Sequence, residues 1–396
     1  MKADRHHLSE IFLSFLKLGC VAFGGPVAHL GYFQEEYVRK RKWLKESDYA
    51  DLVAFCQFLP GPASSQVGFA IGYRMGGVVG AFLAWVGFTL PSAILMIGFA
   101  LGLSTLNDLD GAGWIAGLKL AAVAVVANAI WSMAAKLCPD RARALIALIS
   151  AAVLLLMANA LWQVGVIAGG AVAGWSLFRG RISNPHSATQ ERGSASKKGW
   201  PYLAIFTLLL IGLPLLRGIN PDGGLAVTEG FYRAGSLVFG GGHVVLPLLD
   251  AFTVGQGWVD KDSFLAGYGA AQALPGPLFA FTGFLGASLS AGPGGVAGGL
   301  LALLAVYLPS WLLVLGALPY WERLRRLKSA RAALMGTNAA VVGLLLAAFY
   351  DPIWTVAVTD STRLAFALVA FALLRYGSVP PWLLVLLSAG VGQLWL

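Results

Sequence analysis

The sequence predicts an all-α integral membrane protein with two homologous halves of inverted topology. Each half has broken or re-entrant helices, and a reversing transmembrane helix joins the two. The first reason is composition, since 58% of the residues are hydrophobic and 12% are charged, with a mean hydropathy of +0.73. A soluble domain would leave much of that apolar surface in water, so part of the solvent must be lipid. The other reasons are a repeated pattern of Gly and Pro interruptions and the distribution of charge among the loops.

Uninterrupted apolar segments supply candidates for crossing the bilayer. About 20 consecutive apolar residues span the hydrocarbon core as a helix. Two of the candidates, 144–158 and 363–376, are short for a crossing. The full set of candidates is 77–103, 114–135, 144–158, 161–178, 200–216, 293–318, 332–350, 363–376 and 380–396.

Four further apolar segments are interrupted by Gly and Pro. The breaks are FGGP in 11–33, PGP in 50–74, FGGG in 229–249 and PGP in 264–290. Pro lacks a backbone donor and Gly loosens a helix, so backbone groups come free at these points. A bilayer tolerates that only where the backbone is inside protein or beside a wet cavity. If all four segments cross, the chain makes thirteen crossings, whereas re-entrant hairpins leave nine.

The interruptions recur in the same order in both halves, at a nearly constant spacing. Chance similarity between Gly-rich membrane segments would not preserve that order, so we interpret them as an internal repeat. The matching pairs are GCVAFGG at 19–25 with GSLVFGG at 235–241, QFLPGP at 57–62 with QALPGP at 272–277, and LPS at 90–92 with LPS at 308–310.

Loop charge orients the two halves. Residues 34–48 carry five basic side chains and are predicted to be cytoplasmic, whereas 250–262 carry three aspartates against one lysine and are predicted to be external. The single span at 200–216 would then invert the second half. The predicted units are an N-terminal transport repeat (1–178), a cytoplasmic linker (179–199), a reversing helix with its loop (200–228) and a C-terminal inverted repeat (229–396).

Paired broken helices in inverted repeats predict a secondary transporter with its site near the middle of the membrane. Half-helices that restart after a break direct free N–H groups and a positive dipole end at an anion. The alternative is that the breaks are kinks filled by neighbouring helices. The predicted substrate-binding residues are Lys17, Gly24, Gly25, Pro26, Gln57, Pro60, Gly61, Pro62 and Ser64 in the first half, and Arg233, Gly240, Gly241, Gly242, His243, Gln272, Pro275, Gly276 and Pro277 in the second.

Several of these side chains have more than one interpretation. Lys17 and Arg233 hold equivalent positions, and we expect them to bind one dianion, with snorkelling to the membrane surface as the alternative. Gln57 and Gln272 can donate to the anion or cap carbonyls that the prolines free. His243 follows the second glycine run, and it can carry a proton or join two helices by a hydrogen bond.

Motifs for catalysis and metal binding are absent from the sequence. It contains no Walker loop, HExxH, CxxC or GxSxG, so neither ATP hydrolysis nor another enzyme activity is supported. The three cysteines have neither metal nor disulfide spacing, and we expect no cofactor and no metal. The net charge of +9 lies in short loops, where it sets topology. We therefore expect no nucleic-acid partner.

In the FGGP segment with its basic loop, the QFLPGP segment and the second copies FGGGH and QALPGP, the chain resembles the chromate ion transporter (CHR) family. The resemblance covers essentially the whole chain and matches the long, two-domain form. It implies chromate efflux that confers chromate resistance, in a multi-pass protein that we expect in the bacterial inner (plasma) membrane. The expected partners are chromate or a sulfate-like oxyanion and the lipid bilayer, with a homodimer left open. A sulfate or other tetrahedral oxyanion transporter is the alternative within transport. A membrane scaffold or a lipid-processing enzyme is the alternative outside it.

Overall fold

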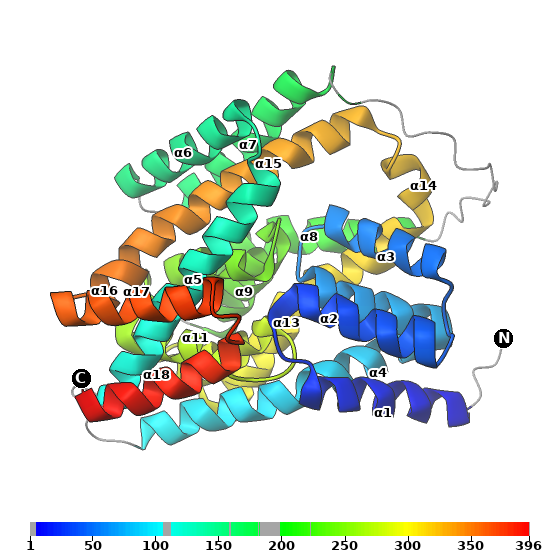
Figure 1. Cartoon of the computed structure of the whole chain (residues 1–396). Coiled ribbons are helices and arrows are strands. Elements are labelled where there is room, and N and C mark those ends of the chain that lie inside the picture. Colours follow the sequence, from blue (N-terminus) through cyan, green and yellow to red (C-terminus); the bar gives the residue numbers. More distant parts are fainter. Residues whose placement is uncertain are drawn as a thin grey trace.

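The computed structural model describes residues 5–105, 112–157, 160–180, 182, 199–221 and 223–395. Every regular element among these residues is a helix, so the predicted all-α class is confirmed. Figure 1 shows α6, α7 and α15 along one side of the molecule, and α1, α4 and α18 along the opposite side. Most of the predicted linker 179–199 lies outside the described residues.

The first half and the helix after it run from α1 to α8. Their bounds are α1 (Arg5–Val21), α2 (Gly25–Phe33), the π-helix η1 (Gln34–Lys40), α3 (Glu46–Phe58), α4 (Ala63–Ser104), α5 (Gly113–Leu137), α6 (Arg141–Leu156), α7 (Ala160–Phe178) and α8 (Trp200–Arg217).

The second half begins with α9. Its elements are α9 (Gly224–Leu237), η3 (Gly242–Val244), α10 (Val245–Thr253), α11 (Lys261–Ala271), η4 (Leu278–Ala280), α12 (Phe281–Ser288), α13 (Gly295–Ala317), η5 (Leu318–Tyr320), α14 (Trp321–Leu324), α15 (Lys328–Ala348), η6 (Phe349–Trp354), α16 (Thr355–Ala357), α17 (Ser361–Arg375) and α18 (Pro381–Trp395).

The helices follow one order in both halves. Taken by the motifs that flank them, α1, α2 and α3 correspond to α9, α10 and α11. Helix α4 has non-helical backbone angles at Gly76 and Gly77, and the two parts on either side correspond to α12 and α13. After them α5, α6 and α7 correspond to α15, α17 and α18. The inverted orientation of the two halves stays a prediction.

Six helical stretches in the described residues are long and apolar enough to cross a membrane. Three of the predicted spans, 144–158, 363–376 and 380–396, form the shorter helices α6, α17 and α18, of 16, 15 and 15 residues. At 1.5 Å per residue these reach about 23 Å, less than the hydrocarbon core of about 30 Å. The number of crossings therefore stays a prediction. The six stretches are Ala63–Ser104, Gly113–Leu137, Leu161–Phe178, Trp200–Arg217, Gly295–Tyr320 and Lys328–Ala357.

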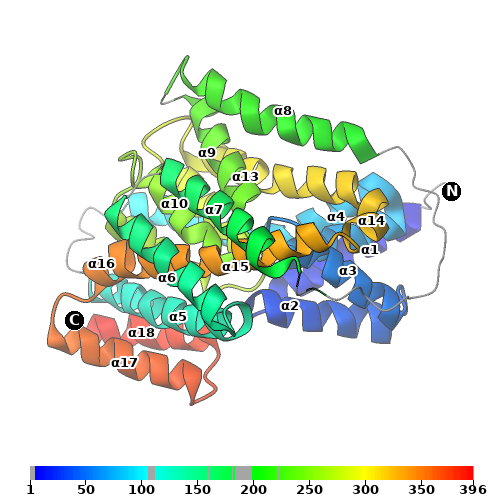
Figure 2. The ribbon, with the colours of Figure 1, turned by 90° about the horizontal axis from the view of Figure 1, so that it is seen from above.

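The two halves interlock through their last helices. Helix α7 of the first half packs along α15 of the second, and α18 of the second half packs along α5 of the first. Glycines allow these close approaches, because a Cβ at Gly170 would lie 2.8 Å from the carbonyl oxygen of Gly336. Figure 2 shows α8 at one edge and α17 and α18 at the opposite edge. The halves are thus parts of one helix bundle.

Three aromatic residues at related positions form a cluster in each half, with different ring geometry. In the first half the ring of Tyr37 stacks on Phe15 and on Trp43, with centroid distances of 4.7 and 4.9 Å. Their counterparts in the second half are Phe252, Phe231 and Trp258. Phe252 meets those two rings edge-on, at 5.5 and 5.0 Å. The repeat seen in the sequence therefore extends to the buried core.

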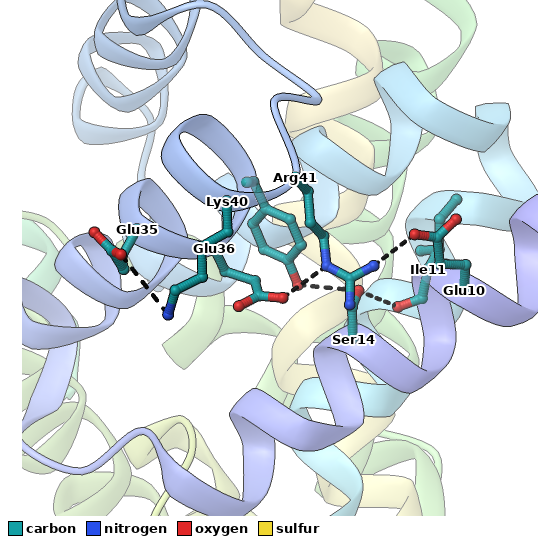
Figure 3. A network of polar contacts seen from close by, with 8 residues as sticks. Glu10, Ile11, Ser14, Glu35, Glu36, Lys40 and Arg41 are labelled. Carbon is teal, nitrogen blue, oxygen red and sulfur yellow. Dashed lines mark hydrogen bonds and ion pairs between the residues drawn. The ribbon is translucent and has the colours of Figure 1, made fainter.

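An ion-pair network fixes the basic loop to α1. Figure 3 shows Arg41 between two carboxylates, with its Nε 2.6 Å from Oε1 of Glu36 and its Nη1 2.6 Å from Oε1 of Glu10. Beside it, the hydroxyl groups of Ser14 and Tyr37 are 3.3 Å apart. The residues that were predicted to set topology thus also hold α1 against η1.

Candidate functional site

Backbone hydrogen bonds join the four interruptions in pairs, the second with the third and the fourth with the first. The N–H of Gly61 donates to the carbonyl oxygen of Val238 at 2.7 Å, and the N–H of Gly276 donates to that of Ala22 at 3.0 Å. Gly61 and Gly276 are the centres of the two PGP motifs, and Ala22 and Val238 are equivalent positions in the other two breaks. Each half therefore clasps the other with the same bond. We call this pair of bonds the reciprocal clasp.

The first and third breaks are also in contact. A Cβ at Gly242 would lie 3.4 Å from Cγ of Pro26. Together with the reciprocal clasp, this contact brings all four breaks to one place. We call it the junction, formed by residues 22–26, 59–62, 238–242 and 272–277.

Glycine is required at the centre of each PGP motif. Gly61 and Gly276 have φ angles of +120° and +92°, which L side chains rarely adopt. A Cβ at Gly61 would overlap Oγ of Ser310, and one at Gly276 would lie 2.8 Å from Oγ of Ser92. Ser92 and Ser310 are the serines of the repeated LPS motif. All three motifs of the repeat therefore meet at the junction.

Helices restart directly after each break. α2 begins at Gly25 and α4 at Ala63, while η3 and η4 begin at Gly242 and Leu278. The first-turn N–H groups of a helix have no partner within the helix. The positive ends of these helices are thus collected at the junction, which is the arrangement that anion binding uses.

Two histidines support the junction from neighbouring helices. His29 is 1% exposed, with Nε2 3.1 Å from the carbonyl oxygen of Ala22 and Nδ1 3.4 Å from Oγ of Ser64. His243 places Nδ1 2.6 Å from the hydroxyl of Tyr268. Both side chains therefore act as links between elements, and His29 and Ser64 connect the first break to the start of α4.

Of the two predicted glutamines, neither has a hydrogen bond to a break in the described structure. Gln57 is exposed, and the Nε2 of Gln272 is buried without a partner. The capping role belongs instead to Gln66, which donates from Nε2 to the carbonyl oxygen of Pro60 at 2.7 Å. Gln66 lies after the first PGP motif, whereas Gln57 lies before it. Nothing in the repeat singles out Gln66, because its counterpart in the second half is Phe281.

The two predicted cations have different surroundings. Lys17 is exposed on α1. Arg233 places Nε 3.2 Å from Oε1 of Glu229, whose Oε2 lies 3.3 Å from Nη1 of Arg217. Glu229 is 1% exposed, and the two guanidinium groups compensate its buried charge. None of the contacts of the described residues brings Lys17 or Arg233 to the junction.

Comparison with known proteins places the chain. A family model described as chromate transporter matches residues 9–175 and 225–393. The chain belongs to the chromate transporter family. One matched region of this family lies in each half of the chain, so the two repeated regions and the resemblance seen in the motifs are confirmed.

Curated relatives of the chain are identical to it at about a quarter of the aligned residues. The chromate transport protein of Cupriavidus metallidurans is 27% identical over 360 residues, which cover 87% of this chain and 82% of the relative. That of Pseudomonas aeruginosa is 28% identical over 353 residues, covering 86% and 80%. An uncharacterized transporter of Methanocaldococcus jannaschii is 28% identical over 389 residues, covering 97% and 94%. No solved structure matches the chain.

Proposed function

We propose that this chain carries chromate out of the cytoplasm by alternating access around the junction, and so confers chromate resistance. The observation that carries the proposal is the reciprocal clasp in a member of the chromate transporter family. A transporter of this kind needs paired broken helices from two halves at a shared place, and the clasp joins such helices. The proposal includes inverted halves bounded as predicted, a bacterial inner-membrane location, and no enzymatic step or cofactor.

The membrane potential favours export of a dianion. Each elementary charge that crosses 100 mV gains or loses about 2.3 kcal/mol. Chromate carries two negative charges near neutral pH, so leaving a negative interior gains about 4.6 kcal/mol per 100 mV. Export can therefore run without a carboxylate proton relay.

Reconstituted protein tests the function and its direction. We expect proteoliposomes loaded with chromate to lose it faster when a potassium gradient with valinomycin makes the interior negative, and more slowly when the sign is reversed. Protein-free liposomes are the control for leak. A rate of chromate loss equal to that control would overturn the proposed function. A rate that is the same for both signs of the potential would overturn uncoupled, electrogenic export.

A further inference from the structure

Unpartnered polar atoms gather between α4 and α13. In a folded protein nearly all buried polar atoms have a hydrogen-bond partner, and each exception costs about 1–3 kcal/mol. The structure instead brings several exceptions together, and each of their side chains is buried or half-buried. The atoms are Gln66 Oε1, Trp85 Nε1, Ser310 Oγ and Trp311 Nε1. Beside them are the hydroxyls of Ser65, Thr89 and Tyr307, which lie against one another.

Six of these residues, together with Phe69, line one space, which we call the indole pocket. The ring of Trp85 meets Trp311 edge-on at 4.6 Å and Tyr307 at 5.4 Å. In an edge-on pair one indole can direct its N–H at the ring of the other, but such a contact is weak. The N–H of the second indole would still have no hydrogen-bond partner. The hydroxyl of Tyr307 lies within hydrogen-bonding reach of Ser65 and Thr89. The side chains leave no room for a water molecule, so the indole pocket is closed in this conformation.

The indole pocket adjoins the junction. Gln66 reaches from the pocket to the carbonyl oxygen of Pro60, and Ser310 lies against Gly61. Ser65 and Gln66 belong to the first turn of α4, whose positive dipole end favours an anion. A ligand in the indole pocket would therefore contact the second break and the reciprocal clasp.

The chemistry of the lining selects an acceptor-rich ligand. Indole N–H groups only donate, and the hydroxyls of Ser65, Thr89, Tyr307 and Ser310 can all donate. Among these lining atoms, Oε1 of Gln66 is the one that can only accept. None of the described lining residues is charged, so no carboxylate repels an anion and no cation is favoured. A tetrahedral oxyanion, with acceptor oxygens on every side, matches this donor set.

Ser65 and the two indoles are not a by-product of the repeat. At the equivalent positions of the other half, Ser65 is replaced by Ala280, Trp85 by Leu303, and Trp311 by Ala93. Those replacements are apolar. Ser310 is repeated as Ser92, and Tyr307 corresponds to Thr89, so the fold repeats part of the donor set. The two indoles are present at one of the two related places, which is expected of a binding site and not of a packing motif that the fold repeats.

We propose that Trp85, Tyr307 and Trp311, with the hydroxyls of Ser65, Thr89 and Ser310, bind the transported oxyanion through uncharged donors when α4 and α13 move apart. The proposal rests on the proposed function. It moves substrate recognition from Lys17 and Arg233 to neutral side chains of the indole pocket. In the closed conformation the N–H groups of Trp85 and Trp311 and the hydroxyl of Ser310 have no hydrogen-bond partner, so the free-energy cost of leaving them unpaired favours opening to an oxyanion.

Variants that each lack one donor test this binding site. Trp85→Phe, Trp311→Phe and Ser310→Ala each remove one donor and keep most of the packing. We expect each to weaken chromate binding to the purified protein roughly ten- to a hundredfold, because each hydrogen bond to a charged ligand is lost. The melting temperature of Ser310→Ala without ligand should stay the same or rise, since an unsatisfied buried group is removed. A purely structural role predicts the opposite, a lower melting temperature with unchanged binding.

The controls are Trp200→Phe and Ser176→Ala, which change exposed residues of α8 and α7. Binding of chromate, and sulfate competition against it, would be measured with radiolabelled chromate on all five variants and the wild type. Folded Trp85→Phe, Trp311→Phe and Ser310→Ala with wild-type binding, alongside a wild type that transports chromate, would overturn this inference alone. A wild type that transports no chromate would overturn the proposed function instead.

Discussion

Replacing Gly61 with alanine should abolish chromate transport and destabilise the folded protein. The backbone at Gly61 has a φ of +120°, and strain of this kind costs on the order of 1–3 kcal/mol for a residue with a Cβ. The new Cβ would also overlap Oγ of Ser310 and lie 2.5 Å from Nε2 of Gln66. Relief of both contacts moves the second break away from Val238 and breaks one half of the reciprocal clasp.

The matched control is Gly98→Ala, a glycine of the following helix α4 with nothing within 4 Å of its Cβ position. Helix propensity favours this change by up to about 1 kcal/mol, so its melting temperature in detergent should not fall. Gly276→Ala should resemble Gly61→Ala, because it has the equivalent bond to Ala22. Wild-type transport and melting temperature in both Gly61→Ala and Gly276→Ala would contradict the importance of the reciprocal clasp.

Replacing Glu229 with glutamine should cause a large loss of stability. The carboxylate is buried between Arg217 and Arg233, whose side chains are each 23% exposed. Removing one partner of a buried ion pair typically costs about 3–5 kcal/mol, because the remaining charges are left uncompensated. Thermal unfolding followed by circular dichroism in detergent measures the change.

A surface ion pair gives the comparison. Glu35 pairs with Arg39 at 3.3 Å and is 45% exposed, so Glu35→Gln should change stability by no more than about 1 kcal/mol. Adding Arg233→Met to Glu229→Gln should recover part of the loss, since one uncompensated charge is removed. Equal effects of Glu229→Gln and Glu35→Gln would show that the Glu229 cluster is not a stabilising element.

The positions of the breaks could be predicted from sequence because Gly and Pro act locally. Each removes a constraint or a donor at its own position, and the structure interrupts its helices at FGGP, PGP and their copies. The repeat could also be predicted, since motif order survives in the chain. The three-dimensional partner of each break could not, because the bond from Gly61 to Val238 joins residues far apart in sequence.

The candidate site was predicted less completely than the fold. Lys17 and Arg233 attract attention because a cation in an apolar segment is costly, yet Arg233 is neutralised by Glu229, a partner that lies one turn earlier in α9. Trp85 and Trp311 give no such signal, because a tryptophan in an apolar helix is ordinary in sequence. Only packing shows that their N–H groups have no partner among the described residues.

Anomalous scattering tests most directly whether the oxyanion binds at the junction. Chromium absorbs X-rays at its own edge, so crystals grown with chromate reveal the ion without a model of the ligand. The account predicts an anomalous peak between α4 and α13, within hydrogen-bonding distance of Ser310 and the indole groups of Trp85 and Trp311. A peak beside Lys17, with none at the junction or in the indole pocket, would contradict it.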